Sequence, residues 1–210
     1  MNIRVKGDTV QIEGYVNAVE RTSKPLKDRL GTFIERIKAG AFKRALSRAE
    51  DVRILLNHNW NRDLGGIKDG NLELYEDPIG LHAKAIIKDA DVAEKARKGQ
   101  LRGWSFGFTD RDVENGNENG MAVRNVNDLD LFEVSLIDRS HVPAYDGTLV
   151  TVRTADDTAN INVAECIESE INIRVEEEPE PTTDNQAAET GAIDYTQYHN
   201  MIDEMKGEKS

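Results

Sequence analysis

The chain has 210 residues, of which 31% are charged and 6% aromatic, and its formal net charge is −12. This length suits one domain with a core of its own, or one domain with an appendage. The charge is uneven: residues 151–210 hold 4 Lys or Arg and 15 Asp or Glu (−11), which leaves 23 basic and 24 acidic residues (−1) in 1–150. A near-neutral body with an acidic tail gives no electrostatic reason to expect nucleic-acid binding.

Cysteine usage and hydropathy exclude further classes. The single cysteine, Cys166, excludes an internal disulfide framework, and no CxxC motif or His/Cys cluster suggests a metal site, so we expect no metal and no cofactor. The first ten residues lack the apolar stretch of a signal peptide, and no run approaches the ~18 to 20 apolar residues of a membrane span. We therefore expect a soluble intracellular protein that does not bind membranes.

The predicted elements are mostly strands. Alternating apolar and polar residues indicate half-buried strands, and Phe42 and Leu46 at i and i+4 indicate a short amphipathic helix. Asp89 or Asp91 can cap a second helix, and Val113–Gly120 is polar and rich in Asn and Gly, which predicts an exposed loop. In chain order, strands are predicted at 10–16, 52–56, 71–75, 81–87, 100–109, 123–137 and 142–152, and helices at 41–49 and 89–98.

The composition changes near residue 153, which predicts a domain over 1–153 and an acidic, flexible tail over 154–210. Within the tail, 176–191 has almost no apolar residue and is typical of a linker. Beyond it, the spacing of Tyr195, Tyr198 and Ile202 allows either a short amphipathic helix or a frayed end. No internal repeat is evident.

Two residues with catalytic chemistry each follow an apolar, strand-like run. His58 ends the run RILLNH, and Ser105 lies 47 positions later in GWSFG. A histidine can accept the proton of a serine hydroxyl and make it a nucleophile. GWSFG matches the G-x-S-x-G string of hydrolases, but that motif needs a helix after the serine, and here a strand continues. Taken singly, Ser105 is explained as a small strand residue and His58 as a surface imidazole at a turn.

Three sequence frames taken in order are more specific than any one of them. They are Phe33-x-Glu35-x-Ile37-x-x-Gly40-Ala41-Phe42, the segment WSFGF around Ser105, and DLFEVS at 130–135. This order resembles the prohead proteases of tailed bacteriophages, a family related to the herpesvirus assemblins, over about residues 10–152. Two departures are Ala39, where the family usually has proline, and a longer link between Asp138 and Pro143.

The resemblance implies a catalytic Ser105, His58 as its general base, and Glu133 as the acidic third member. His141 is the alternative third member, because assemblins use a second histidine. Strand alternation places Leu131, Glu133 and Ser135 on one face and Asp130 on the other, which makes Asp130 the weaker candidate. A solvated strand face is the competing explanation of Glu133.

The resemblance also implies an α+β fold: a mostly antiparallel, assemblin-like β-barrel with short surrounding helices, followed by the acidic tail. The implied activity is that of a serine endopeptidase that cleaves the scaffold segment of the major capsid protein, and itself, inside the procapsid in the host cytoplasm. Assemblins act as dimers, so a homo-oligomer is compatible with it. The alternative is a catalytically inactive scaffolding or capsid-assembly protein that docks through its acidic tail.

Overall fold

A computed structural model describes residues 1–27, 31–140, 150–153, 160–163, 167–168 and 171–176. The strands are β1 (Asn2–Lys6), β2 (Thr9–Ala18), β3 (Leu26–Lys27), β4 (Thr32–Ile37), β5 (Arg53–Leu56), β6 (Asn59–Gly66), β7 (Leu72–Glu76), β8 (Gly80–Lys88), β9 (Leu101–Glu118), β10 (Met121–Asp138), β11 (Val150–Arg153), β12 (Asn160–Val163), β13 (Ile167–Glu168) and β14 (Asn172–Glu176). The helices are α1 (Ala41–Arg48) and α2 (Ala90–Arg97).

The strands form two sheets. One has five strands in the order β14-β1-β2-β8-β7, and the other has nine, with the path β11-β12-β9-β10-β4-β3. In the second sheet β13 also pairs with β9, and β5 joins β10 to β6. The prediction of a mostly β protein with short helices is confirmed. Among the strands that the structure describes, no pairing closes either sheet, so the predicted barrel is not found.

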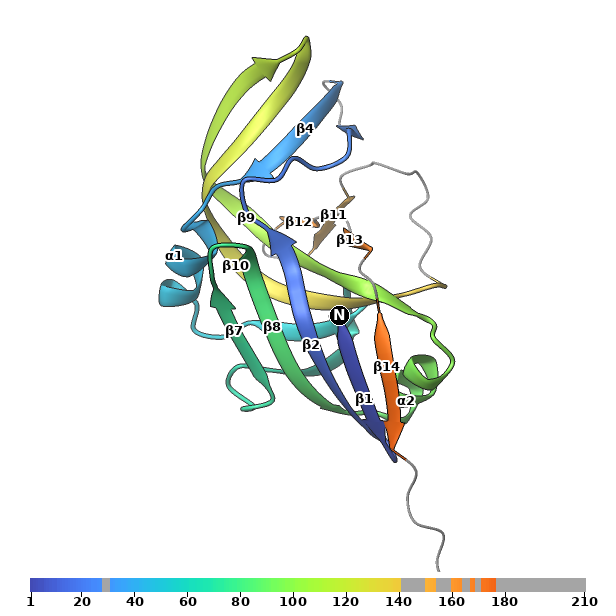
Figure 1. The fold of residues 1–210 in the computed structure, drawn as a ribbon. Helices are drawn as coiled ribbons and strands as arrows, with labels where there is room; N and C mark the ends of the chain where they lie inside the picture. The colour runs from blue at the N-terminus through green and yellow to red at the C-terminus, as the bar shows by residue number, and fades with distance from the viewer. Residues whose placement is uncertain (28–30, 141–149, 154–159, 164–166, 169–170, 177–210) are drawn as a thin grey trace, which may run out of the picture. The chain divides into compact units, whose positions relative to one another are not determined.

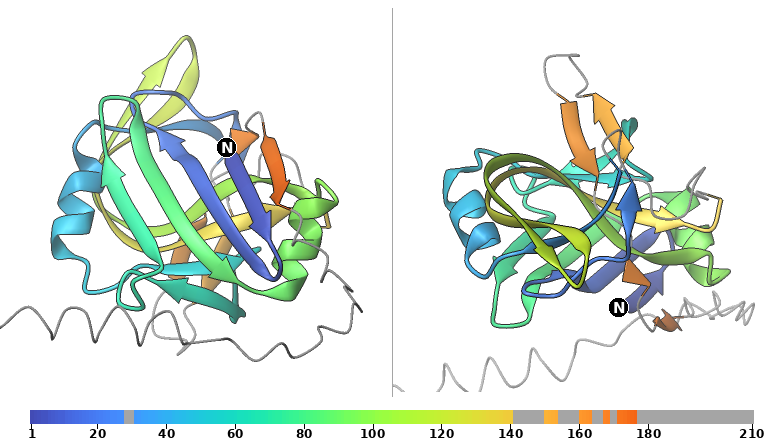
Figure 2. Two further views of the ribbon diagram at one scale, coloured as in Figure 1. Left: turned by 60° about the horizontal axis from the view of Figure 1, so that its bottom comes forward. Right: turned by 90° about the horizontal axis from the view of Figure 1, so that it is seen from above.

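The hydrophobic core lies between the two sheets. Val10 and Ile12 of β2 and Trp104, Phe106 and Phe108 of β9 are all buried in one apolar cluster. Side chains alternate across a strand, so these residues share the inner face while their polar neighbours point away from it. The helix α1 packs on β7 and β10, whereas α2 packs on β1 and β2 (Figure 2). The core therefore holds β9 and β10 in a fixed position opposite the five-stranded sheet.

Both predicted helices are present. The helix α2 begins after Asp89, whose side chain accepts a hydrogen bond from the backbone N–H of Val92, and it is followed by Gly99 at a φ of 63°. The helix α1 buries Phe42, as predicted, together with Ala41 and Ala45, whereas Leu46 is partly buried against the core. Its N-cap is Gly40, at a φ of 85°, a conformation that glycine adopts without strain.

The loop predicted at 113–120 is wrong, although residues 114–120 are exposed as expected. The strand β9 continues to Glu118 and β10 begins at Met121, so only Asn119 and Gly120, both with positive φ, form the turn. Figure 1 shows this hairpin extending beside β4. Polar residues form strands here because residues 113–118 of β9 pair with 121–126 of β10. Ion pairs add contacts across the sheet: Arg111–Asp130 and Arg124–Asp110 join β9 to β10, and Arg36 of β4 contacts Glu118 of β9.

Strands also occur after residue 153. The compact unit that contains the two sheets spans Met1–Glu178, and β12, β13 and β14 pair with strands of the predicted domain. Of the strand predicted at 142–152, residues 142–149 lie outside the described residues, and β11 begins at Val150. The predicted linker at 176–191, apart from Glu176, and the predicted C-terminal helix lie outside them as well.

One short repeat exists that the sequence analysis overlooked. The residues NIRV occur at 2–5 and again at 172–175. The two copies lie in β1 and β14, which pair in parallel with identical residues opposite each other, from Asn2 with Asn172 to Val5 with Val175. The copies differ in burial: Ile3 and Val5 are buried in the core, whereas every residue of β14 is exposed. Four residues are too few to stand out as a repeat before the pairing is known.

Glu35, from the first of the three sequence frames, is a buried carboxyl group in β4. Burial raises its pKa to about 7; the guanidinium of Arg124, 3.0 Å away, opposes the rise, and Asp110 adds to it. Since Arg124 also pairs with Asp110, its charge is shared between two carboxylates.

We expect this group to make the protein less stable as the pH rises. Between pH 4.5, the ordinary pKa, and about 7, the folded state binds more protons at Glu35 than the unfolded state does. The free energy of unfolding therefore falls across this window by up to about 3 kcal/mol. Urea denaturation at pH 5 and pH 8 measures the fall, and Glu35→Gln should remove it. An equal pH dependence in the two proteins would contradict the assignment.

Candidate active site

His58 lies in the two-residue turn between β5 and β6. Asn57 and His58 have φ values of 55° and 56°, and Leu56 pairs directly with Asn59 across the hairpin. Positive φ at both central positions is the property of the type I′ turn, which suits the twist of a hairpin and favours asparagine. The turn is bound to β10, because the N–H of Asn57 donates to the carbonyl of Leu136 at 2.9 Å.

The side chain of His58 contacts Glu133. Nδ1 of His58 lies 2.7 Å from Oε1 of Glu133, and the exposed fractions of the two side chains are 7% and 1%. The Ser135 hydroxyl donates to the other carboxylate oxygen, Oε2, at 2.7 Å, and accepts the backbone N–H of His58 at 3.0 Å. Three groups thus form a closed ring of hydrogen bonds, in which both carboxylate oxygens of Glu133 have partners.

A β-bulge in β10 places Glu133 on this face. Leu131 pairs with Phe108 and Val134 with Phe106, both of which face the core, while Glu133 pairs with Gly107. The residue between, Phe132, is extra, and it shifts the alternation of side chains by one position. The prediction that Leu131 shares a face with Glu133 is therefore wrong: Leu131 faces the core, and Glu133 and Ser135 face away from it.

Ser105 lies near the start of β9, directly opposite Ser135 of β10. Residues paired in this way have Cα atoms about 4.5 to 5.5 Å apart and side chains on one face of the sheet. The third strand of the site is β5, in which Leu55 pairs with Ser135 from the other side. Three adjacent strands, β9, β10 and β5, therefore carry Ser105, the pair Glu133 and Ser135, and the turn with His58.

The structure places His58 and Glu133 in contact and Ser105 on the neighbouring strand, and it leaves His141 untested. Ser135 lies between Ser105 and His58, and Glu133 binds His58. His141 lies outside the residues that the structure describes. A solvated strand face does not explain Glu133, since this carboxyl group is 1% exposed. A buried carboxylate with an imidazole and a hydroxyl as partners can orient that imidazole and stabilise its protonated form.

Ser135 is a site residue to which the sequence analysis gave no role, although it stands in the frame DLFEVS. Its hydroxyl connects the carboxylate to the turn that carries His58. A second contact holds the same turn: Oδ1 of Asn57 accepts the N–H of Asp138 at 3.0 Å. The available signal was the position of Ser135 two residues after Glu133, which places both side chains on the same face of a strand.

Ser135→Ala is expected to lower the peptidase rate about tenfold to a hundredfold, because the imidazole loses part of its support and small misplacements are costly. The variant should also lose roughly 1–3 kcal/mol of stability, since the N–H of His58 loses its acceptor. Steady-state kinetics and urea denaturation measure the two effects. Ser47→Ala is the control, because that hydroxyl is in α1 and binds only a carbonyl of its own helix among the contacts described. Full activity of the folded Ser135→Ala protein would exclude a positioning role.

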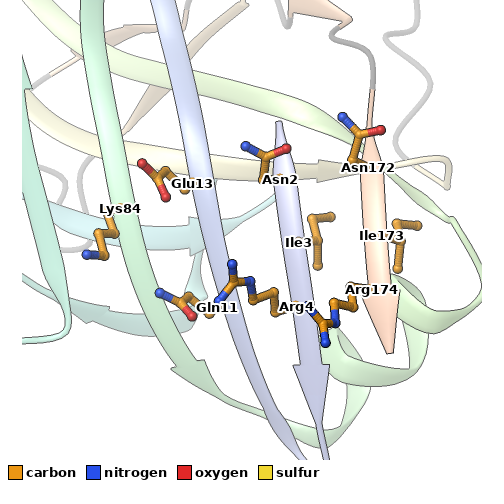
Figure 3. A pocket seen from close by; sticks show the side chains of 9 residues that line it. All are labelled: Asn2, Ile3, Arg4, Gln11, Glu13, Lys84, Asn172, Ile173 and Arg174. Carbon is orange, nitrogen blue, oxygen red and sulfur yellow. The ribbon is translucent and has the colours of Figure 1, made fainter. Parts of the chain in front are cut away.

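Two pockets lined by described residues contain none of the predicted site residues. The larger, about 450 Å³, is an open hollow on the five-stranded sheet (Figure 3). The second, about 400 Å³, lies beside α1 and the bulge at Phe132. The lining of the first is polar and of mixed charge; it comprises Asn2, Ile3, Arg4, Gln11, Glu13, Lys84, Asn172, Ile173 and Arg174. This set includes no nucleophile with a neighbouring base.

Within the described ranges, no group of three or more His, Cys, Asp or Glu side chains could hold a metal ion. No helix in those ranges is both long and apolar enough to cross a membrane.

Comparison with known proteins assigns the chain to a family. The model of the caudovirus prohead serine protease family matches residues 1–161. This range contains β1 to β10, and with them His58, Ser105 and Glu133. Neither the curated proteins nor the solved structures give a match. Because the family model covers well over half of the 210 residues, the chain belongs to the caudovirus prohead serine proteases.

Proposed function

We propose that this protein is a serine endopeptidase of phage capsid maturation with Ser105, His58 and Glu133 as its catalytic residues. The observation that carries the proposal is the contact of 2.7 Å between His58 and Glu133 on the strand next to Ser105. Membership of a serine protease family supports the reaction class. The assignment of roles rests on the geometry and on the three sequence frames.

The mechanism follows from the chemistry of the three groups. Glu133 accepts a hydrogen bond from Nδ1 of His58, which leaves the lone pair of Nε2 available to accept a proton. The Ser105 oxygen attacks the peptide carbonyl while His58 accepts its proton, and His58 then delivers this proton to the leaving amine. Water hydrolyses the acyl-enzyme by the same route. The charge of the imidazolium is balanced by the buried carboxylate throughout.

The substrates that the family implies are the major capsid protein, at its scaffold segment, and the protease itself. The site of action is then the interior of the procapsid in the host cytoplasm, and a homo-oligomer is compatible with the relation to assemblins. The chemistry described above needs no cofactor.

The alternative function is that of an inactive scaffolding protein. The contacts of Glu133 count against it, because a fold without catalysis has no need to bury a carboxylate beside an imidazole. Co-expression with the major capsid protein of the same phage separates the two functions. The wild type should shorten the capsid protein and Ser105→Ala should not. Equal processing by both would exclude Ser105 as the nucleophile, and no processing by either would favour the scaffolding function.

A further inference from the structure

The edge of β9 beside Ser105 is paired with a later segment of the chain. The strand β10 occupies one edge of β9, so β12 and β13 pair with the other. Asn162 and Val163 of β12 pair with Phe108 and Gly107, and Ile167 and Glu168 of β13 pair with Trp104 and Gly103. Both pairings are antiparallel, and they lie on the two sides of Ser105. Figure 1 shows β12 and β13 next to β9.

The residues around Ser105 make this edge suitable for a peptide. Trp104 and Phe106 face the core, so Gly103, Ser105 and Gly107 share the opposite face. The two glycines have no side chain that would cover the serine. Both glycines are register partners of the later segment, Gly107 of β12 and Gly103 of β13. Small residues at these two positions allow a neighbouring backbone to approach closely.

An extended peptide commonly binds to a protein by adding a strand to a sheet edge. On this edge of β9, such a peptide runs past Ser105 with its backbone in the plane of the sheet. We propose that the described residues of this later segment, 160–163 and 167–168, occupy the strand position that a substrate peptide takes, so that the chain competes with its own substrate. This inference rests on the proposed protease function. It adds where the substrate binds, and that a segment of the same chain occupies this place in the absence of substrate.

Burial and pairing agree with this regulation. Ser105 is 1% exposed, so a substrate in solution does not reach its hydroxyl in this form. The pairing that would have to open is short, since β12 and β13 each contribute two register pairs with β9. The following strand, β14, is exposed at every residue, although Ile173 and Val175 are only 38% and 47% exposed. An incoming strand can replace the backbone pairing of β12 and β13 with its own.

The test uses the full chain with Val163→Pro and Ile167→Pro combined, because proline removes a backbone N–H and is poorly accommodated in a paired strand. The first measurement is hydrogen exchange of the peptide spanning 101–108, in the Ser105→Ala background so that cleavage does not interfere. We expect faster exchange in the proline variant. The second is labelling of Ser105 by a fluorophosphonate probe in the active background. If about a tenth of the molecules are open in the wild type, labelling should accelerate about tenfold.

Glu73→Pro is the matched control, because Glu73 is an exposed residue of β7, the edge strand at the other end of the five-stranded sheet. It should leave both measurements near the wild type. Unchanged exchange in the double variant, unchanged labelling despite faster exchange, or equal acceleration by Glu73→Pro would each overturn the inference. Faster exchange with no labelling of any variant, including the wild type, would instead reject the protease function and leave the occupancy of this edge established.

Discussion

Replacement of Ser105 by alanine is expected to lower the rate of peptide hydrolysis by roughly 10⁴- to 10⁶-fold, because no acyl-enzyme can form. The fold should survive, since Ser105 lies between two glycines on the face of β9 that points away from the core. The measurement is the rate of appearance of the shortened capsid protein, with the secondary structure of both proteins checked by circular dichroism.

A control for Ser105→Ala is available in the neighbouring strand. Ser135 lies directly opposite Ser105 and is equally buried, so Ser135→Ala removes a hydroxyl from the same environment. It should cost far less activity than Ser105→Ala, because its hydroxyl supports the base and does not attack the substrate. Equal losses in the two variants, or a larger loss in Ser135→Ala, would contradict the choice of Ser105 as nucleophile.

Glu133→Gln should lower the rate by about 10⁴-fold, the second-largest expected effect. A neutral amide cannot stabilise the imidazolium of His58, and its NH₂ group can donate to Nδ1 and so hold the wrong tautomer. The shape of the side chain is nearly unchanged, so the loss of rate results from the missing negative charge and from the reversed direction of the hydrogen bond to Nδ1. The measurement is kcat at neutral pH, together with a urea denaturation curve that shows the variant to be folded.

His141→Ala decides between the two candidates for the third member. We expect a rate near that of the wild type, because Glu133 already occupies Nδ1 of His58 at 2.7 Å. An abolished rate in His141→Ala, combined with a nearly normal rate in Glu133→Gln, would assign the role to His141. Loss in both variants would mean that His141 has a separate function in the reaction or in folding.

Local sequence patterns were sufficient for much of the fold. Trp104, Phe106 and Phe108 alternate with small residues, and this period of two predicts a strand whatever surrounds it. Asp89 and Gly99 mark the ends of α2 because capping depends on a few adjacent residues. Such features are determined over a few positions, so they are legible before any long-range contact is known.

Features that depend on pairing between distant segments could not be predicted in this way. The polar stretch at 113–120 forms strands because its residues pair with β10 across the turn, and Arg36 of the more distant β4 forms an ion pair with Glu118. The bulge at Phe132 reverses which side chains face the core, and only the register against β9 reveals it. The pairing of β14 with β1 joins residues that are 170 positions apart in the sequence.

The sequence by itself determined which residues are candidates for catalysis and the order of the frames that contain them, because these are properties of neighbouring positions. Only the tertiary structure decided that His58 and Glu133, 75 residues apart, are in contact. The physical reason is that β5 pairs in parallel with β10, which brings the turn after β5 to the carboxylate two positions from Ser135. A strand pairing of this kind is selected by the packing of the whole core, and no local pattern specifies it.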